Sequence, residues 1–201
     1  MALVFPNKFP VLSTDRLVLR QLTPEDRDAM FAIFSDREVT ADYFDLPTLT
    51  DAGQAARLIG RLREGFAKKQ SLRWGITLKP ENRVVGTVGF NYVMPPTLRG
   101  GVGFDLAHAY WGRGLMREAL PAVIEYGFRT MGLNRIEALV VPANAASAGL
   151  LRRLGFRDEG TLRDYGFWKD RFWDLTCFSL LRTDPSPAAP HRSGPDGGQT
   201  G

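Results

Sequence analysis

Hydrophobic positions in the first seventy residues change from a strand-like to a helix-like spacing. Residues 16–22 are rich in leucine and valine, and Thr23-Pro24 follows as a helix start, with threonine as N-cap and proline in the first turn. Apolar residues then recur at helical spacing to about residue 34, and again over 51–69. The pattern predicts one strand followed by two amphipathic helices.

The rest of the chain alternates between the two periods. Strand-like runs at 72–78, 83–92 and 101–108 predict an antiparallel meander, and a helical pattern follows over 115–131. A strand at 135–141, a short helix at 145–154 and strands at 156–165 and 173–182 complete the series. The order βααβββαβαββ indicates an α/β fold, with a mixed, centrally antiparallel sheet of about seven strands and helices on both faces.

Composition places these elements in one globular domain. The chain has 201 residues, of which 44% are hydrophobic and 24% charged, so collagen-like, coiled-coil and wholly disordered chains are excluded. Residues 184–201 contain four prolines and four glycines and offer little to bury. We therefore expect a globular domain over 1–183 and a disordered Pro/Gly-rich tail over 184–201.

Charge and cysteine content restrict the partners. The 26 basic and 22 acidic residues give a net charge of +4 without a Lys/Arg-rich run, which suits a small anionic ligand and disfavours nucleic acid. A single cysteine, Cys177, and two histidines exclude an internal disulfide and a Cys/His zinc site, so no metal is expected. Without an apolar run of about 18 residues or a signal sequence, we expect no membrane contact and a cytoplasmic protein.

The stretch Tyr110-Trp111-Gly112-Arg113-Gly114-Leu115-Met116-Arg117 lies where a predicted strand ends and a helix begins. Its glycines let backbone N–H groups converge at a helix start, which suits an anion such as a pyrophosphate. A dinucleotide-binding loop would need a third glycine where Arg117 stands, and the Gly-Lys-Ser/Thr of a P-loop is missing. A tight strand-to-helix turn without a ligand is the alternative.

The same loop resembles the acetyl-CoA loop of the GNAT superfamily, in the W-G-[KR]-G-x-[AG] form of its Rim-type branch, which includes ribosomal-protein amino-terminal acetyltransferases. Further segments resemble that branch in the same order and extend the likeness to about residues 13–182: STDRLVLRQLTPED, VVGTVGF, RIEALVVPANAASAGLLRRLGFRDEG and LRDYGFWKDRFWDLTCFSLLR. The resemblance implies an N-acetyltransferase that uses acetyl-CoA and acts on a primary amine, with a protein amino terminus as the leading acceptor. A small-molecule amine and a non-catalytic CoA-binding module are the alternatives.

The resemblance also implies which residues hold the cosubstrate. Backbone groups of Phe104, Asp105 and Leu106 would hold the pantetheine and the acetyl group. The loop amides would hold the pyrophosphate, and they belong to Gly112, Arg113, Gly114, Leu115, Met116 and Arg117. Two positions depart from the family: Met116 replaces a small residue, and Leu151 stands where many GNAT enzymes carry a tyrosine that protonates the leaving thiolate.

Beyond this loop, Ser147 and Glu137 are candidates for catalysis, and Asn144 is a candidate for binding the cosubstrate. Asn144 opens the helix predicted at 145–154 and suits an N-cap for Ser147. By resemblance, Asn144 would also bond the pantetheine, and Ser147 would supply the proton that Leu151 cannot. An incidental hydroxyl on the helix surface is the alternative for Ser147. Glu137 is the candidate base, with a paired or solvated glutamate as its alternative, and Asp105 and Asp164 are lesser candidates.

Aromatic residues gather in the last predicted hairpin, around Lys169-Asp170-Arg171. Most are expected to pack in the core or at an interface. Some would line the acceptor cleft, and an exposed subset would favour a homodimer. The residues are Tyr165, Phe167, Trp168, Phe172 and Trp173.

Overall fold

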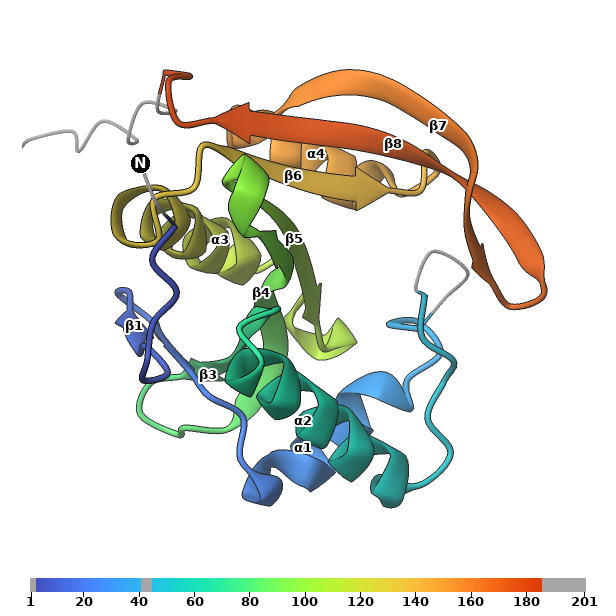
Figure 1. Cartoon of the computed structure of the whole chain (residues 1–201). Helices are drawn as coiled ribbons and strands as arrows, with labels where there is room; N and C mark the ends of the chain where they lie inside the picture. Colours follow the sequence, from blue (N-terminus) through green and yellow to red (C-terminus); the bar gives the residue numbers. More distant parts are fainter. Residues whose placement is uncertain (1–2, 41–44, 186–201) are drawn as a thin grey trace, which may run out of the picture.

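The strands of the protein form one open sheet, and the computed structural model describes residues 3–40 and 45–185 (Figure 1). The sheet has eight strands in the order β1-β2-β3-β4-β5-β6-β8-β7. They are β1 (Leu12–Ser13), β2 (Leu17–Arg20), β3 (Leu72–Leu78), β4 (Val84–Met94), β5 (Arg99–Leu106), β6 (Arg135–Val140), β7 (Arg157–Trp168) and β8 (Arg171–Leu181). The mixed α/β fold is confirmed, with one strand more than expected, because the two residues of β1 are too few to show an alternating pattern.

In the described part of the chain, four α-helices accompany the sheet: α1 (Arg27–Phe34), α2 (Ala52–Ala67), α3 (Leu115–Glu125) and α4 (Ala145–Arg153). Local side chains set where several of them begin. Asp51 caps α2 by accepting the Gln54 N–H at 3.0 Å. A 3₁₀ turn, Pro24–Asp26, precedes α1, and a π-helical turn, Tyr126–Thr130, follows α3. The helix starts read from the sequence therefore hold to within a few residues.

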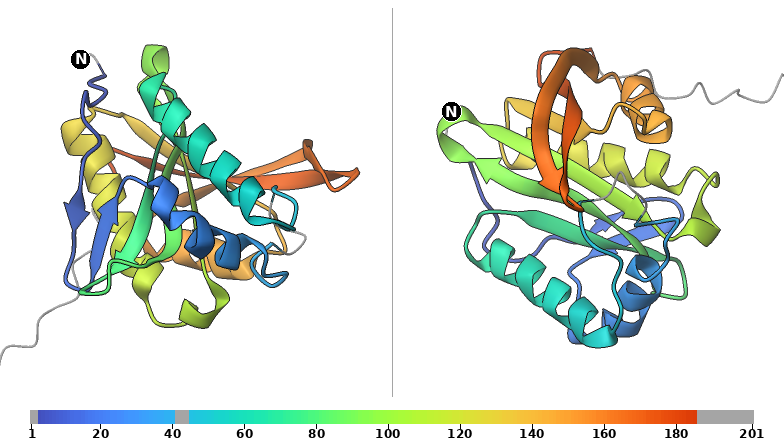
Figure 2. Two further views of the ribbon diagram at one scale, coloured as in Figure 1. Left: turned by 90° about the horizontal axis from the view of Figure 1, so that it is seen from below. Right: turned by 90° about the vertical axis from the view of Figure 1, so that its right-hand side faces the viewer.

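The helices cover both faces of the sheet, as the two views of Figure 2 show. On one face, α1 and α2 bury a cluster that includes Met30, Phe34 and Ile59. On the other, α3 and α4 bury a larger cluster around Trp74, Phe90, Leu120, Leu151 and Phe178. Burying one such side chain contributes about 1.5–3 kcal/mol, so these two layers fix the sheet in place.

The sheet splits between β5 and β6. These two strands are parallel and pair only over Arg99–Gly101 and Arg135–Glu137, whereas all other neighbouring strands are antiparallel. Beyond Gly101 they diverge, and β8 and β7 continue the sheet on the far side of β6 (Figure 1). Each strand of the split therefore has one backbone edge that no neighbouring strand covers.

The described chain stays packed through Asp184. The Asp184 carboxylate accepts the Leu181 N–H at 2.8 Å and lies 3.1 Å from the Arg157 guanidinium. Composition predicts that the tail begins at Asp184, whereas in the structure Asp184 bonds to the folded domain. The rest of that tail, 186–201, lies outside the described residues, so its predicted disorder stays a prediction.

Candidate active site

A cavity of about 430 Å³ lies at the split. Strands β4, β5 and β6 provide most of its sheet residues, and α1, α2 and residues 45–46 also line it. Five of the predicted site residues line it: Phe104, Asp105, Glu137, Asn144 and Ser147. Apolar side chains complete it, among them Met30, Phe34, Leu46, Leu58, Leu62 and Trp168. The cavity thus joins uncovered strand edges to a mixed polar and apolar wall.

The glycine loop lies beyond the carboxyl end of β5, outside the lining of this cavity. The Trp111 indole N–H ties the loop to that strand by donating to the Leu106 carbonyl at 2.7 Å. Gly112 and Gly114 have φ angles of 71° and 73°, a left-handed conformation that glycine adopts without strain. The loop therefore turns sharply from the strand end into α3.

The start of α3 presents free backbone donors. The first helical bond runs from the Glu118 N–H to the Gly114 carbonyl at 3.2 Å. The N–H groups of Leu115, Met116 and Arg117 precede that bond and have no backbone partner within the described chain. The helix dipole adds partial positive charge at the same point. This arrangement can bind an anion through the main chain.

Arg16 braces the loop from β1–β2. Its guanidinium donates to the Arg113 carbonyl at 3.1 Å and to the Glu118 carboxylate at 2.6 Å. Burial alone would raise the pKa of Glu118, but hydrogen bonds from Thr14 and Arg16 lower it. The carboxylate in the first turn is therefore charged and paired. The Met116 side chain, which replaces the small residue of the family, packs against the larger core cluster.

Asn144 holds the start of α4. Its side-chain oxygen accepts the Ser147 N–H at 3.1 Å, so the N-cap predicted from the spacing is present. The Ser147 hydroxyl, which borders the cavity, has no hydrogen-bond partner in the described ranges. One turn later, Leu151 is completely buried in the core. Ser147 thus places a hydroxyl at the cavity, one helical turn before the position that the family gives to tyrosine.

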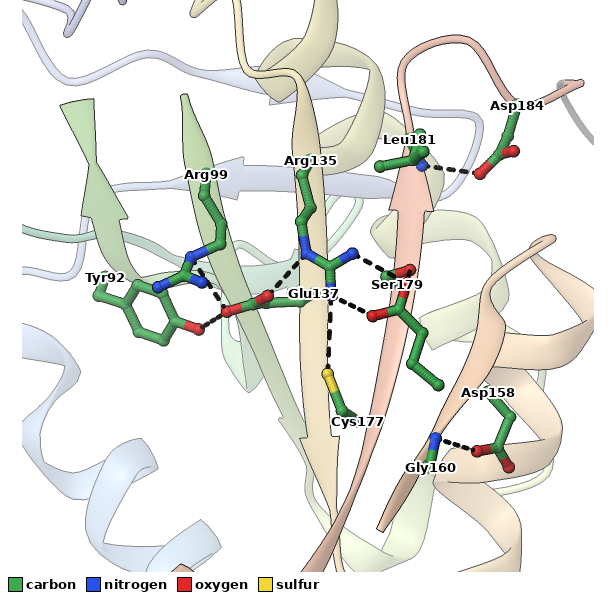
Figure 3. A network of polar contacts seen from close by, with 11 residues as sticks. Tyr92, Arg99, Arg135, Glu137, Asp158, Gly160, Cys177, Ser179, Leu181 and Asp184 are labelled. Atoms are coloured by element: carbon green, nitrogen blue, oxygen red, sulfur yellow. Dashed lines mark hydrogen bonds and ion pairs between the residues drawn. The ribbon is translucent and has the colours of Figure 1, made fainter. Parts of the chain in front are cut away.

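Glu137 lies at the closed end of the split, paired in register with Gly101 (Figure 3). Its Oε1 accepts the Tyr92 hydroxyl and lies 3.3 Å from Arg99 Nε, and its Oε2 accepts Arg135 Nε at 2.9 Å. Burial raises the pKa of Tyr92, and the carboxylate of Glu137 adds to that effect. Glu137 is therefore a paired glutamate, which is the alternative to its predicted role as a base.

The remaining polar candidates have other surroundings. The Asp105 carboxylate accepts the backbone N–H and the hydroxyl of Thr87 at 3.1 and 2.8 Å, and it also pairs with Arg73. His108, which precedes the glycine loop, packs at a tilt against Trp111, with ring centroids 4.6 Å apart. Asp164 is exposed on β7 and does not line the cavity. Asp105 is the one of these three that faces the site.

Sequence reasoning missed Tyr92, Asn91 and Arg73, which all line the cavity. For Tyr92 a β-bulge between Phe90 and Tyr92 is the cause, because two residues of β4 then stand opposite one of β5. Strict alternation places Tyr92 on the face of Phe90, which is core. Nothing in the local sequence marks the bulge.

The β7–β8 hairpin reaches the same site. Trp168 lines the cavity and stacks on Trp173, with centroids 5.2 Å apart. Tyr165, Phe167 and Phe172 are 59–62% exposed. The Lys169 ammonium donates to the Thr40 carbonyl at 2.7 Å, which joins the hairpin tip to the segment after α1.

Within residues 3–40 and 45–185, no cluster of three or more His, Cys, Asp or Glu side chains could hold a metal ion. Over the same residues, no helix is both long and apolar enough to cross a bilayer.

A model of the acetyltransferase (GNAT) domain matches residues 16–157. The uncharacterized N-acetyltransferase p20 of Bacillus licheniformis is 40% identical over 86% of this chain and 97% of its own. The ribosomal protein uS5-alanine N-acetyltransferase of Escherichia coli is 33% identical, over 79% of this chain and 86% of its own. RimL, a ribosomal L7/L12 alpha-N-protein acetyltransferase solved with coenzyme A, shares the fold with a TM-score of 0.76 and 19% identity, over 86% of this chain and 97% of its own.

Proposed function

Since this chain belongs to the GNAT acetyltransferase family and is an N-acetyltransferase, we propose that it transfers the acetyl group of acetyl-CoA to a protein amino terminus. The observation that carries the proposal is the split between β5 and β6, with the glycine loop beyond its open end and Ser147 on its border. The relative that acts on uS5 alanine supports this acceptor class. A small-molecule amine is the competing acceptor.

The residues present fit the proposed cosubstrate. A thioester-linked cosubstrate supplies an activated acetyl group and a thiol leaving group. We assign its pyrophosphate to the amides of 112–117, because the N–H groups at the start of α3 are free to bond an anion. The pantetheine is assigned to the backbone of Phe104, Asp105 and Leu106, where β5 has lost its parallel neighbour. Main-chain recognition explains why Asp105 can use its carboxylate inside the sheet.

The proposed chemistry asks little of the side chains. Ser147 would donate to the sulfur as it leaves, and a free thiol pKa near 8.5 means that modest help suffices. Asn144 would bond the pantetheine while its Oδ1 caps α4. Glu137 would lie close to the bound amine, since it stands at the closed end of the split. The hydroxyl of Ser147 would thus serve as the acid in place of the family's tyrosine, whose position is occupied by Leu151.

The hairpin tip supports a macromolecular acceptor. Its exposed aromatic side chains adjoin Trp168, which itself lines the cavity. Aromatic side chains with large exposed area are typical of binding surfaces. Sedimentation of the free protein checks the alternative that a second copy covers them in a homodimer. A cytoplasmic location belongs to the same proposal, and the unpaired Cys177 agrees with a reducing compartment.

Gly114→Glu tests the assignment of the loop. A carboxylate at the N-cap of α3 would repel the pyrophosphate, so calorimetry should show loss of acetyl-CoA binding. Gly114→Gln is the matched control, because it carries the same φ strain and a similar shape without the charge. It should retain measurable affinity. Wild-type affinity in a folded Gly114→Glu protein would overturn the assignment.

An acceptor screen tests the rest. Wild-type protein is incubated with acetyl-CoA and either an alanine-initiated peptide or cadaverine, and thiol release is followed. Faster release with the peptide supports a protein amino terminus. Faster release with cadaverine favours the small amine, and binding without release would favour a non-catalytic module.

A further inference from the structure

We propose that the Tyr92 hydroxyl receives the acceptor amine by accepting one of its N–H groups, and that Glu137 is a positioning residue that holds this hydroxyl in place. The inference rests on the proposed function. It assigns to Tyr92 a contact with the amine, and it removes from Glu137 the role of base.

The β-bulge turns Tyr92 toward the cavity. Phe90 pairs with Val102 and Tyr92 with Gly101, so Asn91 is the extra residue of the bulge. Phe90 and Val93 point into the core, whereas Asn91 and Tyr92 both line the cavity. Regular pleating would have buried the Tyr92 ring on the opposite face.

Gly101 makes room for the ring. A Cβ at this position would lie 2.3 Å from two ring carbons of Tyr92 and 2.7 Å from its hydroxyl oxygen. The hydroxyl end of the ring therefore lies over Gly101 of β5, a residue without a side chain. There it meets the carboxylate that Glu137 extends from β6, and Figure 3 shows this contact. Tyr92, Gly101 and Glu137 form one row across three strands.

This row stands where the split closes. Gly101 and Glu137 are the last paired residues before β5 and β6 diverge. The glycine loop follows the other end of β5, so the anion site and the row lie toward opposite ends of the split. A cosubstrate held by its phosphates at the loop would present its far end toward the row. An amine that meets it there meets Tyr92.

Hydrogen-bond capacity decides what Tyr92 can do. A phenol has one donor and can also accept, and here the donor is committed to Glu137. What remains is an acceptor, which suits the N–H of an amine and not a thiolate, which requires a donor. Both oxygens of Glu137 already accept, and the residue is only 7% exposed. The amine therefore meets the phenol oxygen and not the carboxylate.

In the proposed step no side chain of the protein acts as the base. The neutral amine uses its lone pair to form the C–N bond to the acetyl carbon, and the C–S bond breaks. The nitrogen loses one proton to water, and the sulfur gains one from the Ser147 hydroxyl, which regains its proton from water. Tyr92 keeps its own proton throughout, and its contribution is to aim the amine.

Tyr92→Phe tests the contact. With the alanine-initiated peptide as probe, kcat/KM should fall about tenfold to a hundredfold, while the calorimetric Kd for acetyl-CoA changes less than about twofold. Tyr126→Phe is the matched control, because it removes a half-buried hydroxyl that does not line the cavity. It should leave kcat/KM unchanged. Wild-type kcat/KM in Tyr92→Phe would overturn the inference.

Glu137 variants separate positioning from proton transfer. Glu137→Gln keeps an oxygen that accepts the Tyr92 hydroxyl, so it should retain activity within about tenfold of wild type and the same pH profile. Glu137→Ala should fall to the level of Tyr92→Phe. The double variant Tyr92→Phe/Glu137→Gln should be no slower than Tyr92→Phe alone, because the two residues act as a unit. Glu137→Gln as slow as Glu137→Ala, with an altered pH profile, would make Glu137 the base.

Different results would contradict the proposed function and the role of Tyr92. Wild-type protein that binds acetyl-CoA and acetylates neither the peptide nor cadaverine would overturn the proposed function and this inference with it. Wild-type protein that transfers, with Tyr92→Phe equally fast, would overturn the inference alone. The Glu137 series gives the answer independently if Tyr92→Phe does not fold.

Discussion

At the scale of single residues, Asn144 and Ser147 divide the roles at the start of α4. Ser147→Ala should lower kcat roughly tenfold to a thousandfold with little change in the Kd for acetyl-CoA, because its hydroxyl is needed only as the sulfur departs. Asn144→Ala should weaken acetyl-CoA binding and cost about 1 kcal/mol of stability through loss of the cap. Single-turnover kinetics and calorimetry distinguish the two. Wild-type turnover in Ser147→Ala would mean that water protonates the sulfur.

The charge of Glu159 makes the stability of the fold depend on pH in acid. Hydrogen bonds from Arg135, and then from Ser179, lower the pKa of Glu159 from 4.5 to about 2. A lowered carboxyl pKa stabilises the fold above the unfolded value and loses that contribution as pH falls through the folded value. The contribution should therefore be complete above about pH 4.5 and fade toward pH 2. Urea unfolding should show a shallower acid decline in Glu159→Gln than in wild type, and equal declines would contradict it.

At the scale of the element, the row across β4, β5 and β6 depends on a missing side chain. Gly101→Ala should push the Tyr92 ring off Glu137, lower kcat/KM as Tyr92→Phe does, and cost about 1–3 kcal/mol of stability. Gly60→Ala on α2 is the control, since its Cβ meets nothing within 4 Å. It should stabilise by up to about 1 kcal/mol and leave transfer unchanged. Normal transfer by Gly101→Ala would show that the ring position is unimportant.

At the scale of the whole molecule, the contacts of Asp184 set where the folded unit ends. A chain that stops after Pro185 should keep the full-length Tm, because the composition of 186–201 offers little to bury. A chain that stops after Thr183 loses the bonds of Asp184 to Leu181 and Arg157, and its Tm should drop by about 2–4 °C. Asp184→Ala in the full chain should reproduce most of that drop. Equal Tm values for both truncations would remove Asp184 from the folded unit.

The sequence by itself determined nearly all the elements, their order and the glycine turn that starts α3, because these depend on neighbouring residues. The 2.0 and 3.6 periods are local properties, and they predicted the helices and every strand except the two-residue β1 to within a few residues. Gly112 and Gly114 are contiguous with the helix that they start, and Asn144 is three residues from the N–H that it caps. The family motif was legible for the same reason.

Only the tertiary structure decided how the site closes. Tyr92 and Glu137 are 45 residues apart, and they meet because a bulge shifts one strand by a residue and a glycine leaves the space between them empty. The split of β5 from β6 is likewise a matter of which strands lie side by side and for how long. Register shifts and strand separations are set by packing between distant segments. The alternation of residues within one segment therefore does not predict them.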